Sequence, residues 1–274
     1  MRKGWLMGLC AAVCFPVFAQ KVDVKLELAY TVFIVGEPVL VQVSGMNGLR
    51  DDIRFVPEST DRLFFEITTD DPNEYLTQSD ARPMASGMTI RTGESFKRKV
   101  ELDKWFPLLK EGRYLARAIL LHNGTRYESQ KKSFDVVPGI LLQEGTQMFV
   151  KPADLKRSFK LVYWHRNKVE RLFLTVKDEP TGFVWDSTDL GNLLHGSKPK
   201  LDIAPDGVVT VVHKASPDNF IRTVLWSLPK SLEVVERNTL LDPEISASQR
   251  AKTLYGEITD GKKQGEKKSW WKFW

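Results

Sequence analysis

Cysteine is almost absent from this sequence of 274 residues. The only two, Cys10 and Cys14, lie within the first nineteen positions. The rest of the chain therefore has no disulfide, no thiol nucleophile and no thiolate ligand for zinc. Secreted animal domains commonly depend on disulfides, so a cysteine-free exported chain favours a bacterial cell envelope.

Long hydrophobic runs are absent as well. The apolar stretch Leu6–Phe15 is shorter than the roughly 20 residues that a membrane-spanning helix needs. Arg2 and Lys3 precede it and Val17-Phe18-Ala19 follows it, which is the pattern of a secretory signal peptide. We expect cleavage after Ala19 and export to the periplasm or the cell exterior. Neither cysteine lies in the context that lipid attachment requires.

The net positive charge of the chain comes from its two ends. The formal net charge is +5, to which Arg2 and Lys3 contribute +2 and residues 261–274 contribute +4, so residues 20–260 carry −1. A nucleic-acid-binding domain needs a basic face on its folded part. The charge distribution therefore argues against nucleic acid as a partner.

Period-two alternation dominates the N-terminal part of the chain. Val22-x-Val24-x-Leu26-x-Leu28 and Val39-x-Val41-x-Val43 alternate as half-buried strands do. The Asn123-Gly124 pair favours a tight hairpin turn. We expect roughly seven short strands up to Val137, with other strands at 63–67, near 96–102, at 112–120 and at 133–137. This spacing predicts a β-sandwich.

The same part of the chain resembles the immunoglobulin-like sandwiches of bacterial surface and periplasmic proteins. The resemblance rests on Gly36-Glu37-Pro38-Val39, an entry into the second strand, and on Leu109-x-x-Gly112-x-Tyr114. It implies that Tyr114 is a corner tyrosine whose hydroxyl bonds back to the backbone. It implies no functional residues, because such folds serve many unrelated functions.

The second half also has the pattern of strands. The runs 159–163 and 171–176 flank a polar turn at 165–168, and Pro205-Asp206-Gly207 separates two further strands. We expect an all-β protein: a signal peptide (1–19), an immunoglobulin-like sandwich (20–138), and a second sandwich or meander (139–242). A short helix near 246–256 and a flexible tail would complete it (243–274).

No catalytic motif or cofactor-binding motif is present. None of the four histidines has a metal-ligand neighbour in the sequence, and we expect no metal and no cofactor: His122, His165, His195 and His213. Acidic loop residues at 70–74 and 80, and the pair Asp186 and Asp189, match no calcium-loop pattern, which favours solvated loops.

The C-terminal tail is the most unusual segment. Three of the eight tryptophans lie in the last five residues, beside a run of lysines. Tryptophan favours membrane headgroups, and lysine favours anionic surfaces. Three interpretations stay open: contact with a membrane, contact with a protein partner, and docking onto the body of the chain. The contacting residues would be Lys267, Lys268, Trp270, Trp271, Lys272, Phe273 and Trp274.

These patterns favour a non-catalytic envelope protein that binds or scaffolds a partner, with a surface polysaccharide as a further ligand class. The alternative is a hydrolase acting on glycans or peptides. Its site would use a carboxylate among Glu170, Asp178, Asp186 and Asp189. Tryptophans could stack on sugar rings in either case, the candidates being Trp164, Trp185 and Trp226.

Overall fold

The computed structural model describes residues 21–70, 76–78, 86–149, 155–179, 182, 184–228 and 231–241. The predicted signal peptide, the helix at 246–256, the tail and most of the acidic segment at 70–80 lie outside these residues. The described residues form strands and loops with a single 3-10 turn, η1 (Leu102–Lys104), so the all-β prediction is confirmed. Among them, no helix is long and apolar enough to cross a membrane.

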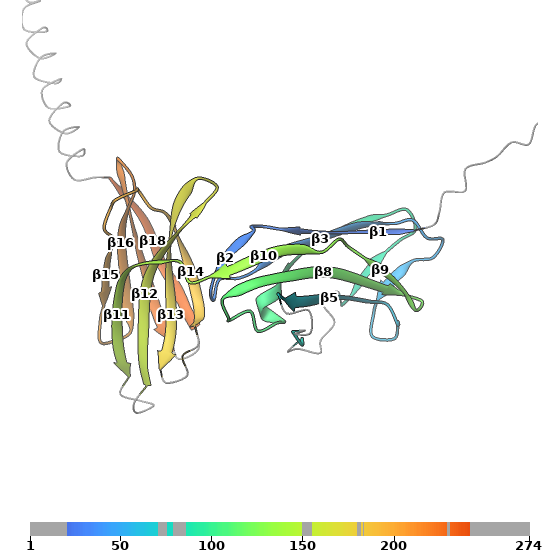
Figure 1. The fold of residues 1–274 in the computed structure, drawn as a ribbon, viewed down its shortest axis with the longest axis horizontal. Coiled ribbons are helices and arrows are strands. Elements are labelled where there is room, and N and C mark those ends of the chain that lie inside the picture. Colours follow the sequence, from blue (N-terminus) through green and yellow to red (C-terminus); the bar gives the residue numbers. More distant parts are fainter. Residues whose placement is uncertain are drawn as a thin grey trace, which may run out of the picture.

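The N-terminal half has a β-sandwich-like arrangement of two main sheets (Figure 1). One sheet has the order β1 (Val22–Leu28), β3 (Leu40–Asn47) and β7 (Ser95–Glu101). The other has the order β2 (Val32–Ile34), β10 (Lys132–Val137), β8 (Gly112–His122) and β5 (Arg62–Thr69), with β9 (Thr125–Glu128) paired to β8. A small third sheet pairs β4 (Ile53–Phe55) with β6 (Met88–Ile90).

Alternation explains why these strands form. In β1 the residues Val22, Val24 and Leu26 are buried, whereas the charged residues between them are exposed. The Tyr114 hydroxyl donates to the backbone carbonyl of Lys110 at 2.8 Å, as expected of a corner tyrosine. Asn123 and Gly124 both have positive φ and close the β8–β9 hairpin, as predicted.

The number of strands in this half was underestimated. The described residues of this half form ten strands, where the sequence suggested about seven. The strands that were missed, β2, β4 and β6, have three residues each, which is too short for alternation to be recognised. Their positions depend on the sheets that they join.

The C-terminal half consists of two four-stranded antiparallel meanders that enclose a second core. The first contains β11 (Ile140–Phe149), β12 (Leu155–Arg166), β13 (Val169–Glu179) and β14 (Val184–Asn192). The second contains β15 (Lys200–Ile203), β16 (Val208–Ser216), β17 (Asn219–Leu228) and β18 (Ser231–Leu241). The predicted hairpin across 165–168 and the turn at 205–207 are both present.

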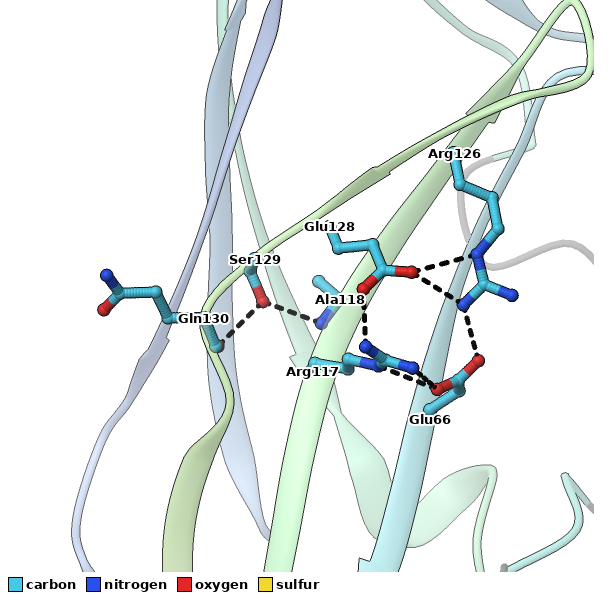
Figure 2. Close-up of polar contacts among 7 residues, drawn as sticks. All are labelled: Glu66, Arg117, Ala118, Arg126, Glu128, Ser129 and Gln130. Atoms are coloured by element: carbon cyan, nitrogen blue, oxygen red, sulfur yellow. Dashed lines mark hydrogen bonds and ion pairs between the residues drawn. The ribbon is translucent and has the colours of Figure 1, made fainter.

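A closed ring of four charges covers the outer face of β5, β8 and β9 (Figure 2). Arg117 contacts the carboxylates of Glu66 and Glu128, and Arg126 contacts the same two carboxylates. Burial disfavours the Glu66 charge, but hydrogen bonds from Arg126 and Arg117 outweigh it and lower the pKa of Glu66. The ring ties the β8–β9 hairpin to β5.

Candidate functional site

The junction between the two halves is built around one buried ion pair. Arg166, at the end of β12, donates to both carboxylate oxygens of Glu37 at 2.7 and 2.8 Å. The Glu37 carboxylate also accepts the Ile34 amide at 2.9 Å, and Arg166 donates to the Val32 carbonyl at 3.1 Å. Burial disfavours the Arg166 charge, but the contacts with Glu37 outweigh it and raise the pKa of the guanidinium.

Aromatic and apolar contacts surround this pair. The Arg166 guanidinium lies 3.9 Å from the ring centre of Tyr30 and 5.2 Å from that of Phe173. Ile34, Val162 and Phe173 form a separate buried cluster. The packing of Phe173 in this cluster explains the apolar run in β13. One face of the strand packs on the core of the C-terminal half, and the other face meets the N-terminal half.

Two glycines allow the halves to approach closely. A Cβ atom on Gly36 would lie 2.9 Å from Val184, and one on Gly139 would lie 2.9 Å from Val162. Both glycines have positive φ, at +82° and +75°, which side chains rarely adopt. Only Pro138 and Gly139 connect β10 to β11, so the junction is short as well as tightly packed.

A cleft of about 460 Å³ lies beside this junction. The N-terminal half contributes Val35, Leu109 and Lys110 to its wall, and the first meander of the C-terminal half contributes the outward-facing side chains of β12 and β13. Three lysines from three different elements line the cleft together with apolar groups: Lys110, Lys160 and Lys177. The volume lies in the range of ligand-binding pockets, and the lining of lysines and apolar groups suits a ligand with an apolar part and an anionic part.

A second hollow of about 380 Å³ adjoins the first. The two share Leu109, Lys110 and Glu111, and the second continues to Arg113 and Tyr114 on β8. The shared lining residues place the two hollows side by side. We take the cleft and its continuation as the candidate site.

The four carboxylates considered for a hydrolase are engaged in other contacts. Asp178 receives two hydrogen bonds, at 2.5 and 2.8 Å, from the fully buried Arg157. Asp189 pairs with Arg171 at 2.8 Å. Glu170 and Asp178 stand eight residues apart on one strand, about 26 Å, which is too far for a catalytic pair. Burial raises the pKa of Asp186, which accepts backbone hydrogen bonds.

The structure brings two histidines together where the sequence did not. His165 Nε2 and His195 Nδ1 lie 3.1 and 2.7 Å from the same oxygen of Glu170. His122 lies 2.9 Å from the Asp61 carboxylate inside the N-terminal half. Within the described residues, no group of histidine, cysteine and acidic side chains is arranged to hold a metal ion.

His213 differs from the other three histidines because it is buried in the second core. Within the described part of the chain, neither of its ring nitrogens has a hydrogen-bond partner. Burial lowers the pKa of His213 to about 4, and the nearby Asn192 backbone only partly offsets this effect. The imidazole is therefore neutral at neutral pH.

The three candidate tryptophans have different environments. Trp164 packs on the apolar cluster at the junction, and Trp185 lies under the Arg157 guanidinium at 4.4 Å. Trp226 is 51% exposed on β17 and is free to stack on a ligand. The tail residues Lys267–Trp274 lie outside the described residues.

The residues that form the junction and the cleft were missed by the sequence reasoning. Glu37 was noted only as part of the entry into the second strand, and Arg166 only as part of a polar turn. The signal available in the sequence was Phe173, a large apolar residue on the face of the strand opposite Leu172 and Leu174, which indicates a strand that is covered on both sides at that point.

Comparison with known proteins does not assign this chain to a family. No protein-family model matches the chain, and no curated protein matches it. Solved structures do align with the chain, among them that of the sporulation control protein Spo0M from Bacillus subtilis, which aligns over 88% of this chain and 98% of its own, with 12% identity and a TM-score of 0.27.

Proposed function

We propose that this protein is an exported, non-catalytic binding or scaffolding protein of the bacterial cell envelope. In this proposal the N-terminal half is an immunoglobulin-like sandwich, supported by the corner hydrogen bond of Tyr114. The C-terminal half is a second domain, and the tail rich in lysine and tryptophan attaches the protein to a partner or to a membrane surface.

The observation that carries the proposal is the buried Glu37–Arg166 pair. A bidentate pair, enclosed by Tyr30 and Phe173, holds the two halves in one fixed arrangement. A fixed arrangement presents the cleft as a preformed surface, which lowers the entropic cost of binding. Rigid paired β domains are suited to spacing and docking.

A hydrolase is not proposed, because three of its four candidate carboxylates bind basic or histidine side chains. No pair among the four has contacts that suggest shared acid–base chemistry.

The test is affinity purification from native envelopes with residues 20–274 and with a chain ending at Asp260. We expect a specific protein to be recovered only with the intact tail. Co-sedimentation with anionic and with neutral liposomes tests whether the tail binds a membrane surface. Loss of co-sedimentation on truncation would show that the tail binds the membrane. Failure of the full-length chain in both assays would overturn the proposal.

A further inference from the structure

The three lysines of the interdomain cleft define what the cleft can bind. Lys110 follows η1 in the N-terminal half, whereas Lys160 and Lys177 extend from β12 and β13. The body of the chain is close to neutral, so their convergence on one hollow is a local feature and not the result of a generally basic surface.

The negative charges near the cleft do not neutralise the three lysines. Glu111 is an exposed residue that lines both hollows, Asp70 is an exposed residue that lines the second hollow, and Glu144 lies 3.7 Å from Lys160. The Lys160 and Glu144 side chains are 36% and 41% exposed, so water weakens their attraction. Within the described residues, Lys110 and Lys177 form no ion pair.

The apolar part of the wall sets a second requirement. Val35, Val162 and Val184 line the same cleft, and Leu109 continues into the adjoining hollow. Val35 and Val162 are almost completely buried, so Val184 and Leu109 supply the accessible apolar surface, which a fully polar anion would leave uncovered. The occupant therefore combines carboxylates with apolar groups, and it is long enough to extend from one hollow to the next.

We propose that the cleft binds an extended polypeptide segment of a partner protein in which acidic and apolar side chains are interspersed. This inference rests on the proposed binding function and names the chemistry of the partner. In an extended chain, successive side chains point in opposite directions, so acidic residues reach the lysines while apolar residues meet Leu109 and Val184. Ionic attraction across a partly exposed cleft weakens as salt concentration rises.

The experiment selects binders from a display library of random linear peptides on immobilised residues 20–274. We expect the selected peptides to be rich in Asp and Glu interspersed with apolar residues. Their binding should be about tenfold weaker to the triple variant Lys110→Glu, Lys160→Glu and Lys177→Glu, and it should weaken with added salt. Selection without acidic enrichment, or equal binding to the variant, would overturn the inference.

A matched control changes three exposed lysines that line neither hollow: Lys97→Glu, Lys198→Glu and Lys200→Glu. This variant has the same net charge as the cleft variant, so unchanged binding to it shows that position and not total charge is responsible. Photo-crosslinking of a selected peptide to the wild-type chain gives a readout that needs no variant. Crosslinks to Leu109 or Val184 support the cleft, and crosslinks confined to other surfaces contradict it.

The two proposals can fail separately. If a native partner is recovered equally well by the wild type and the cleft variant, the cleft inference is wrong and the scaffold function stands. If acidic peptides bind in the cleft but the full-length chain recovers no partner and does not co-sediment with liposomes, the scaffold function is wrong and the cleft is still a peptide site.

Discussion

The carboxylate of Glu37 and the guanidinium of Arg166, 129 residues apart in the sequence, form a bidentate pair at 2.7 and 2.8 Å. Both side chains are almost completely buried, at 9% and 5% exposure. Removing one partner would leave the other charge buried without compensation, which costs much more than the pair itself contributes.

Arg166→Met is therefore expected to lower the free energy of unfolding by about 3–5 kcal/mol. The uncompensated Glu37 carboxylate should also loosen the junction, so that calorimetry resolves two transitions where the wild type shows one. The double variant Glu37→Gln with Arg166→Met should recover part of the loss, because no buried charge is left. A single variant within 1 kcal/mol of the wild type would show that the pair does not hold the junction.

A second buried arginine allows a comparison within one strand. Arg157 is fully buried and donates to Asp178, the Ser227 hydroxyl and the Leu228 carbonyl. We expect Arg157→Met to cost about 3 kcal/mol in urea unfolding. The adjacent Lys156 pairs with Glu179 at 43% and 44% exposure, so Lys156→Met should cost less than about 1 kcal/mol. Equal costs for the two variants would contradict this account of the core.

His213 predicts how stability depends on pH. Its pKa is about 4 in the folded protein, whereas its ordinary value is 6.5. The unfolded chain therefore binds the proton more tightly, and lowering the pH from 6.5 towards 4 favours unfolding. The contribution of this residue is complete above pH 6.5 and decreases by about 3 kcal/mol on acidification.

The variant His213→Leu should show a smaller decrease in unfolding free energy between pH 7 and pH 4 than the wild type. Chemical denaturation at a series of pH values measures this difference. Parallel curves for the two proteins would mean that His213 does not take up the proton on unfolding.

The charge ring of the N-terminal half predicts a smaller, salt-dependent effect. Glu66→Gln removes the charge shared by Arg117 and Arg126, and we expect a loss of about 1 kcal/mol because the ring is partly exposed. The pKa of Glu66 is lowered by its partners, so its contribution is present above its ordinary value of 4.5 and is lost at lower pH. High salt should reduce the difference between variant and wild type.

Asp23→Asn is the control for this prediction. Asp23 pairs with Lys25 on the exposed face of β1, with both side chains more than half exposed, so Asp23→Asn should change the free energy of unfolding negligibly. A loss as large as that of Glu66→Gln would mean that the ring has no special contribution.

Local signals in the sequence predicted several features correctly. The Asn123-Gly124 pair adopts the positive φ angles of a hairpin turn, because few other residues tolerate them. Tyr114 bonds back to Lys110, as the resemblance to immunoglobulin-like sandwiches implied. The turn at 205–207 lies between the strands that its flanking alternation indicated.

Features that depend on contacts between distant segments could not be predicted. Strand β14 was missed because Trp185 to Leu190 mixes buried and half-buried side chains without strict alternation. Two register shifts against β13 cause this irregularity. The cluster of His165, Glu170 and His195 joins a strand pair to a loop, and no spacing in the sequence indicates it.

The sequence by itself determined the all-β class, the hairpin turns and the faces of the longer strands, because these depend on neighbouring residues and on the period-two pattern. Only the tertiary structure decided that Glu37 meets Arg166 and that three lysines converge on one cleft. These contacts depend on how two sheets pack across a two-residue connection, where Gly36 and Gly139 remove the side chains that would keep the halves apart.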